Sequence, residues 1–290
     1  MKKQLFSILI SFVIIPLLVA QPNLKPSDYD ITKDRLLYTI GYAHLDTEWN
    51  WDYPTTINEH ILHTMLENFA LFEKYPDYVF NFTGSRRYKM MKEYYPQLYP
   101  QVKKYIEQGR WKVSGSSVDE GEVNISSSES LIRQVLYGNE FFKNEFGKES
   151  ADYMLPDCFG FLWNLPSILN HCGLIGFSTQ KLTWRSAAGV PFNVGVWKGP
   201  DDKGIIAALN ATSYTSRVEE RLDKNPQWVE RLNQDKEKIG YAFDYRYYGV
   251  GDQGGAPRVN DVKRAVNSLN NDDSNFKVLL TSSDQMYKDI

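Results

Sequence analysis

The stretch Leu36-Leu37-Tyr38-Thr39-Ile40-Gly41-Tyr42-Ala43, followed at once by His44-Leu45-Asp46, decides how this chain is expected to fold. A short apolar run of this length predicts a strand that is buried on both faces. Further along, strand-like runs alternate with helical patterns of ten or more residues almost throughout. This alternation predicts right-handed βαβ units and a mainly parallel sheet, open or closed into a barrel. We therefore expect an α/β fold.

The individual elements follow from hydrophobic periodicity and from helix start and stop residues. Strands are expected at 36–43, 78–82, 111–113, 151–155, 175–179, 204–209 and 276–280. Helices are expected from Pro54 to Phe72, at 100–108, after a capping box formed by Ser126 and Glu129, and at 164–172, 227–238 and 261–269. The sequence contains no internal repeat and no segment of low complexity.

The first twenty residues differ in kind from the rest of the 290-residue chain. Two lysines precede an apolar run from Leu5 to Val19, and the small residue Ala20 ends it. This pattern is typical of a secretory signal peptide, and the run is shorter than the ~20 residues of a membrane-spanning helix. A membrane anchor is the alternative. We expect a secreted (periplasmic or extracellular) protein with no stable membrane span after cleavage, organised as a signal peptide at 1–20, a linker at 21–35 and one domain at 36–290.

Composition argues against two classes of protein, nucleic-acid-binding proteins and small domains held by a disulfide framework. The formal net charge is −3 and no basic cluster is present, so no nucleic acid partner is expected. Cys158 and Cys172 are the only cysteines, which is too few for a disulfide framework, although they could form one bridge.

The end of the first strand carries the sharpest chemical signal. His44 and Asp46 are two positions apart where the chain leaves a strand, so both side chains project to one side and could converge on one cation. A nitrogen and an oxygen ligand suit Zn²⁺. The alternative is a histidine that merely pairs with a nearby carboxylate. Of the other histidines, His60 and His63 lie opposite the apolar stripe of their helix and are expected in solvent, and His171 lies in the last turn of a short helix.

Two more carboxylates follow strand-like runs. Asp157 lies between Pro156 and Gly160, in a tight turn that would present its side chain, although it could instead cap the following segment. Asp252 lies in the glycine-rich loop 249–257, which lacks the Lys-Ser/Thr of a phosphate loop and could be a flexible turn. Parallel α/β folds place their sites at the carboxyl ends of strands, so these carboxylates are candidates for the same site as the strand-end histidine.

Five blocks of sequence, taken together, resemble glycoside hydrolase family 38, the class II α-mannosidases. They occur in the order found in that family and cover roughly residues 36 to 290, which is far more specific than any single block. The blocks are Ala43-His44-Leu45-Asp46-Thr47-Glu48-Trp49, Ser128-Glu129-Ser130-Leu131-Ile132-Arg133-Gln134, Pro156-Asp157-Cys158-Phe159-Gly160, Thr179-Gln180-Lys181-Leu182-Thr183-Trp184 and Gly251-Asp252-Gln253-Gly254-Gly255-Ala256-Pro257.

The resemblance implies a (β/α) barrel-like catalytic domain that binds one Zn²⁺ or similar divalent cation. It implies that the metal ligands are His44, Asp46 and Asp157. It also implies that Asp157 is the catalytic nucleophile and Asp252 the general acid/base of a retaining α-mannosidase, which acts on α-mannosides or mannose-containing glycans.

The resemblance also identifies Lys181 and Trp49 as substrate-binding residues of the sugar pocket. In the family a fourth metal ligand, a histidine, comes from beyond this region. We therefore expect a catalytic domain that is incomplete at its C-terminal end and poorly active alone. The alternatives are a metal-dependent carbohydrate deacetylase, which shares the histidine and aspartate at a strand end, and a truncated non-catalytic chain that binds sugar.

Overall fold

The computed structural model describes residues 24–184 and 189–290, so the predicted signal peptide lies outside the described residues. Strand β1 (Leu36–Ala43) lies inside a five-stranded sheet with the order β3-β2-β1-β8, and β9 also pairs with β1. All the pairings in this sheet are parallel. The other members are β2 (Phe80–Thr83), β3 (Trp111–Ser114), β8 (Phe243–Val250) and β9 (Lys277–Leu280).

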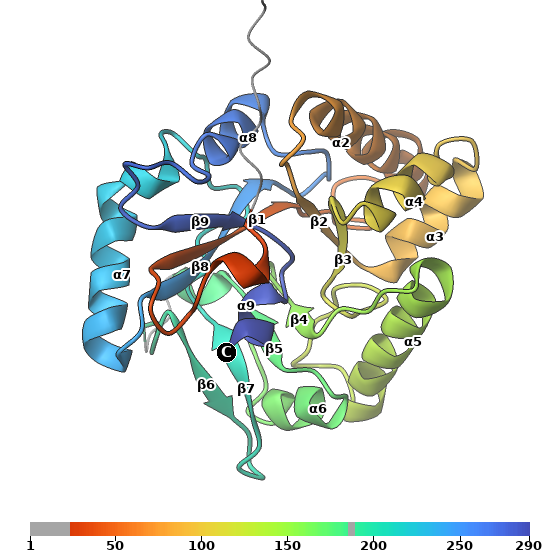
Figure 1. Cartoon of the computed structure of the whole chain (residues 1–290). Coiled ribbons are helices and arrows are strands. Elements are labelled where there is room, and N and C mark those ends of the chain that lie inside the picture. Colours follow the sequence, from red (N-terminus) through yellow and green to blue (C-terminus); the bar gives the residue numbers. More distant parts are fainter. Residues whose placement is uncertain (1–23, 185–188) are drawn as a thin grey trace, which may run out of the picture.

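A second sheet has the order β4-β5-β7-β6, in which only β6 runs antiparallel to its neighbour. Its strands are β4 (Asp152–Met154), β5 (Gly176–Ser178), β6 (Val194–Lys198) and β7 (Gly204–Ala208). Figure 1 shows the strands at the centre of the molecule and most of the helices around them. The predicted α/β fold with a mainly parallel sheet is confirmed, and closure into a barrel stays a prediction.

The helices follow the strands in the expected alternation. The first predicted helix consists of α1 (Tyr53–Thr55), a π-helical segment (Thr56–Ile61) and α2 (Leu62–Lys74). The others are α3 (Ser85–Tyr94), α4 (Tyr99–Glu107), α5 (Ser128–Phe146), α6 (Leu165–His171), α7 (Pro226–Ile239), α8 (Val259–Val266) and α9 (Gln285–Asp289).

The ends of α5 and α7 show how local chemistry sets the helix boundaries. Ser127 Oγ accepts the backbone N–H of Ser130 at 3.1 Å, so the cap of α5 is one residue later than predicted. Asn225 caps α7 in the same way. Both helices end at a glycine in the left-handed conformation, Gly147 and Gly240, which residues with a Cβ adopt less readily.

Strand β1 is buried along its whole length because both of its faces meet apolar side chains. One face, which includes Tyr38 and Tyr42, packs with Tyr245 and Tyr247 of β8 in one cluster. The other face, represented by Leu37, belongs to the larger cluster under the surrounding helices. The strand is therefore held from both sides, and its carboxyl end is a rigid base for a site.

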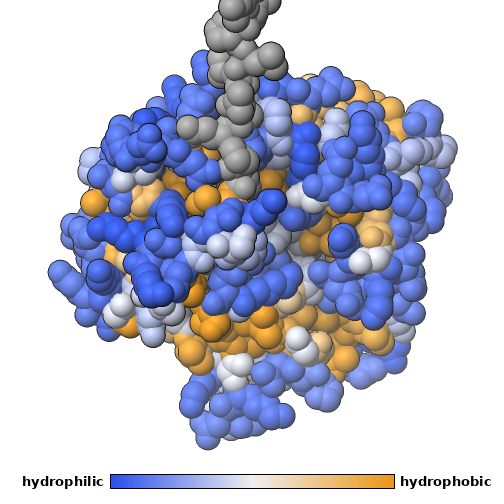
Figure 2. Space-filling view, viewed as in Figure 1, coloured by the Kyte–Doolittle hydropathy of each residue, from blue (hydrophilic) through white to orange (hydrophobic). Residues whose placement is uncertain are grey.

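The described part of the predicted linker lies against this core. Tyr29 meets Tyr38 edge-on at 6.4 Å between ring centroids and donates a hydrogen bond to Asp289 in α9 at 2.6 Å. On the face of the molecule seen in Figure 2, apolar residues gather over the lower centre, near β6, β7 and α9. Most of the remaining surface on this face is hydrophilic. In the described part of the chain, no helix has the length and apolar character needed to span a bilayer. Cys158 and Cys172 are both free.

Candidate active site

The carboxyl ends of β1 and β8 bring three of the candidate residues together. Pairing continues beyond both strands, since His44 N–H donates to Val250 O at 2.9 Å and Asp46 N–H donates to Asp252 O at 2.8 Å. These two backbone bonds fix His44 and Asp46 beside the glycine-rich loop. The side chains of the pair also meet, with His44 Nε2 at 3.3 Å from Asp46 Oδ1.

An imidazole and two carboxylates form the centre of the site. His44, Asp157 and Asp252 each offer one ligand atom, and these atoms all lie within 4.8 Å of one another. His44 is 3% exposed, and Asp157 Oδ2 lies 3.7 Å from its Nε2. Such nitrogen and oxygen donors are those of zinc sites, so these residues fit a divalent cation. Asp46 contacts the same imidazole nitrogen but lies outside this group of three.

Lys181 connects Asp157 to two aromatic rings. Its buried ammonium contacts Asp157 Oδ1. The same ammonium lies 3.4 Å from the ring centroid of Trp184 and 4.5 Å from that of Phe159. Both rings are largely exposed, at 60% and 72%, and offer apolar surface beside the carboxylate. Trp49 is also exposed and packs edge-on against Trp51, with the ring centroids 5.9 Å apart.

Tyr214, in the loop after β7, is a site residue that sequence reasoning missed. Its hydroxyl donates to Asp252 Oδ1 at 2.7 Å, and its ring lies 4.9 Å from the ring of His44. Burial, followed by the hydrogen bond to Asp252, raises the pKa of Tyr214 well above its ordinary value. The hydroxyl therefore stays protonated and acts as a donor. The signal that could have found it is its position just after a predicted strand.

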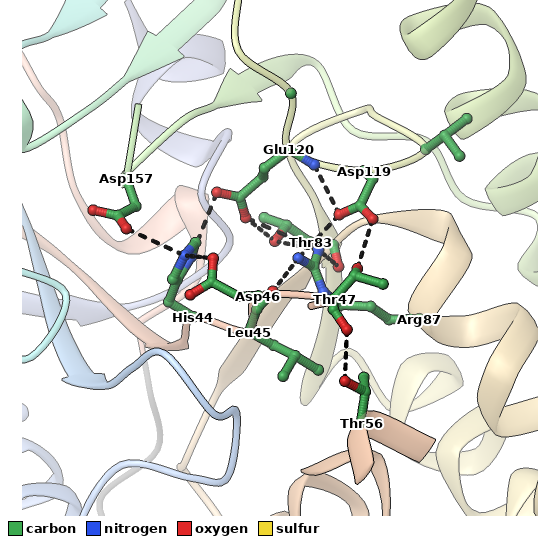
Figure 3. Close-up of polar contacts among 12 residues, drawn as sticks. His44, Leu45, Asp46, Thr47, Thr56, Thr83, Arg87, Asp119, Glu120 and Asp157 are labelled. Carbon is green, nitrogen blue, oxygen red and sulfur yellow. Dashed lines mark hydrogen bonds and ion pairs between the residues drawn. The ribbon is translucent and has the colours of Figure 1, made fainter. Parts of the chain in front are cut away.

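Three further charged residues surround His44 and were not identified from the sequence: Arg87, Asp119 and Glu120 (Figure 3). Arg87 is buried, and its Nη2 forms an ion pair with Asp119 Oδ1 at 3.1 Å. Its Nη1 lies 4.0 Å from Glu120 Oε1. Burial lowers the pKa of His44, but Glu120 and Asp46 together raise it above its usual value. The site is thus a cluster of carboxylates around one imidazole.

The other histidines lie elsewhere in the fold. His63 and His171 are exposed. The expectation that His60 faces solvent is wrong, because this residue is 7% exposed and its ring packs edge-on against Trp51 at 4.7 Å. The physical reason is the π-helical segment that contains His60, since its i→i+5 bonds rotate the side chains away from the 3.6-residue period assumed for the helix.

Comparison with known proteins identifies the family of this chain. Residues 35–290 match the family described as the glycosyl hydrolases family 38 N-terminal domain, and the chain belongs to this family.

The relatives are longer proteins. Alpha-mannosidase G of Dictyostelium discoideum is 29% identical over 243 residues, covering 82% of this chain and 21% of that protein. Alpha-mannosidase of Saccharomyces cerevisiae is 30% identical over 262 residues, covering 88% and 24%. The chain therefore spans about a fifth to a quarter of the length of these curated relatives.

Solved structures share the fold. An alpha-mannosidase from Enterococcus faecalis superimposes with a TM-score of 0.67 at 18% identity, over 88% of this chain and 29% of that one. A putative polysaccharide deacetylase from Mycobacterium smegmatis superimposes with a TM-score of 0.54 at 10% identity, over 92% and 93%. At such low identities these similarities concern the fold alone.

Proposed function

We propose that the protein carrying this domain is a metal-dependent retaining α-mannosidase that hydrolyses terminal α-mannosides of glycans. The family supports the reaction class, and the names of the curated relatives suggest the sugar. The observation that carries the stereochemistry is the spacing of the carboxylates, since one oxygen of Asp157 and one of Asp252 lie within 4.8 Å of each other. Retaining glycosidases hold the two carboxyl groups about 5–5.5 Å apart, whereas inverting enzymes separate them by about 6.5–9.5 Å.

We assign the two catalytic carboxylates by their partners. Asp157, held by Lys181, attacks the anomeric carbon as the leaving oxygen departs. Asp252, held by the Tyr214 hydroxyl, gives its proton to that oxygen and then takes one from the water that releases the sugar. Configuration is retained because each of the two displacements inverts the anomeric carbon.

We assign His44, Asp46 and Asp157 to the ion. Asp46 is included because it contacts Nε2 of His44, the nitrogen that also faces Asp157. A bound Zn²⁺ would supply Lewis-acid coordination of the sugar hydroxyls. The exposed rings of Trp49 and Trp184 would offer apolar faces to the sugar.

The test uses the longest natural protein that carries the domain, with the 290-residue chain assayed beside it. Hydrolysis of an aryl α-mannoside should stop on chelation and return with Zn²⁺. The Asp157→Asn variant should lose at least about 100-fold in kcat. The control Asp201→Asn changes an exposed carboxylate that accepts hydrogen bonds from Ser167 Oγ and the backbone N–H of Lys203, and it should keep full activity. Full activity in a chelator, or release of acetate from an acetylated sugar without glycosidic cleavage, would contradict the proposal.

We further propose that residues 1–20 direct secretion, on the basis of their two lysines, apolar run and final small residue. A reporter fused after residue 22 should be exported with the segment removed. Export should stop when charged residues replace part of the apolar run, and cytoplasmic retention of the unchanged fusion would contradict the proposal.

A further inference from the structure

The two ring nitrogens of His44 face different groups (Figure 3). Nε2 faces Asp46 Oδ1 at 3.3 Å and Asp157 Oδ2 at 3.7 Å. Nδ1 faces the other way, with the Tyr42 hydroxyl at 3.4 Å and Glu120 Oε2 at 3.5 Å. The side of the ring that carries Nε2 belongs to the proposed metal site, and the side that carries Nδ1 does not.

Glu120 lies in the loop after β3, and its side chain is 6% exposed. Its two oxygens have different surroundings. Oε1 accepts hydrogen bonds from the hydroxyls of Tyr42 at 2.7 Å and Thr83 at 2.6 Å. Oε2 is buried and has no hydrogen-bond partner among the residues that the structure describes, and it is the oxygen that faces the imidazole. A buried carboxylate oxygen without a donor is costly, so a donor on His44 Nδ1 would satisfy it.

Tyr42 gives a second route from His44 to the same carboxylate. Because its hydroxyl hydrogen is donated to Glu120, the hydroxyl oxygen remains free to accept from Nδ1. Both acceptors beside Nδ1 thus depend on Glu120. A neutral imidazole whose Nδ1 carries the proton keeps its lone pair on Nε2, which is the form that binds a metal ion.

Arg87 holds this arrangement in place. Its guanidinium contacts Leu45 O, which lies between the candidate ligands His44 and Asp46 just after β1. It also donates to Thr83 O at 3.1 Å. Its Nη1 also lies 4.0 Å from Glu120 Oε1 and supplies a positive charge beside this carboxylate. A buried acid is tolerated when such a partner offsets its charge. The loop after β3 is thereby fixed relative to the end of β1.

We propose that Glu120 is a positioning residue of the metal site, which holds the Nδ1 proton of His44 and so directs the lone pair of Nε2 toward Asp46 and Asp157. This inference rests on the proposed metal-dependent function. Histidine ligands of metals commonly donate their second N–H to a carboxylate, which fixes both the tautomer and the ring orientation.

The first test measures zinc affinity by competition with a chelator. In Glu120→Gln the single amide oxygen is needed by the hydroxyls of Tyr42 and Thr83, so the amide NH₂ faces Nδ1 and favours the wrong tautomer. Zinc should bind about 10- to 100-fold more weakly, with the metal-free melting temperature little changed. Glu120→Asp, which keeps the charge, should lose less. The control Glu122→Gln changes a carboxylate that accepts from Asn124 N–H, and it should bind zinc as the unchanged chain does.

The second test reads the unchanged chain and needs no variant of Glu120. Nitrogen NMR of the histidine-labelled, metal-free chain at alkaline pH should show His44 as the Nδ1–H tautomer, with its signal identified by its absence from His44→Gln. An Nε2–H tautomer in the unchanged chain would overturn the inference, and so would a Glu120→Gln variant with unchanged zinc affinity. If the longest natural protein that carries the domain binds no zinc while the chain shows the Nδ1–H tautomer, the proposed metal dependence fails and the positioning of His44 by Glu120 stands.

Discussion

Asp152, at the start of β4, is a buried carboxyl group whose charge should make the stability of the domain depend on pH. Its Oδ1 accepts from the hydroxyls of Ser150 at 2.6 Å and Ser283 at 3.0 Å. Its Oδ2 is buried and, within residues 24–184 and 189–290, has no hydrogen-bond partner. Burial, with the nearby carboxylate of Asp284, raises the pKa of Asp152 to about 7. Asp152→Asn removes this charge and keeps an oxygen for the two serines.

The size and sign of the effect follow from linkage. A carboxyl group whose pKa is raised on folding binds its proton more tightly in the folded chain, so the free energy of unfolding falls as pH rises from about 4 through about 7. The folded pKa of about 7 exceeds the ordinary value of 3.8 by about three pKa units. At about 1.4 kcal/mol for each unit, the stability lost is at most about 4 kcal/mol, of which about 3 kcal/mol falls between about pH 5 and about pH 8.

The assay is urea unfolding of the unchanged chain and of Asp152→Asn across this range of pH. Groups distant from Asp152 titrate equally in both proteins, so the difference between their free energies of unfolding reports Asp152 together with its neighbour Asp284. This difference should move in favour of the variant as pH rises, by about 3 kcal/mol at most. If the two stability curves run parallel from about pH 5 to about pH 8, Asp152 ionises normally and the reasoning is refuted.

Three other substitutions have defined outcomes. Gly138→Ala should destabilise the domain by about 1–3 kcal/mol in urea unfolding, although alanine favours a helix by ~1 kcal/mol, because the new Cβ would clash with the backbone of Ser116 and Ser117; unchanged or higher stability would contradict this packing. Lys181→Met should lower kcat/KM about 10- to 100-fold, since it removes a charge-assisted contact to the nucleophile, and unchanged kinetics would show that the contact is unimportant. Asp252→Asn should lower kcat about 10²- to 10⁴-fold and weaken zinc binding less than Asp46→Asn does, because the Tyr214 hydroxyl holds one of its oxygens; the reverse pattern would exchange their roles. Matched controls at exposed positions are Glu140→Ala for the helix and Lys198→Met for the lysine.

The parts of the fold that depend on neighbours in sequence could be predicted. Strand β1 is one continuous apolar run, and the alternation of side chains along a strand is enough to place His44 and Asp46 on one side. The sequence indicates a strand-like run before Asp252 but does not fix the bounds of β8, because Asp244 and Arg246 interrupt its apolar pattern. The buried Asp244 is stabilised by Arg231, 2.7 Å away in α7, and this pairing exists only in the folded chain.

The network behind His44 could not be predicted for a related reason. Arg87 lies in the first turn of α3, which follows β2. Glu120 lies in the loop after β3, and Tyr42 belongs to β1. Their contacts arise only when the parallel strands place these three chain segments side by side. The residues are ordinary charged and aromatic positions in the sequence, and nothing local distinguishes them from solvent-exposed ones.

The central claim is double displacement at a pair of closely spaced carboxylates, and the configuration of the first product tests it most directly. Proton NMR during hydrolysis of an aryl α-mannoside by the natural protein should show α-mannose first, followed by slow mutarotation. The separation of at most 4.8 Å between ligand atoms of Asp157 and Asp252 predicts this result. Initial release of β-mannose would mean a single displacement by water and would contradict the account.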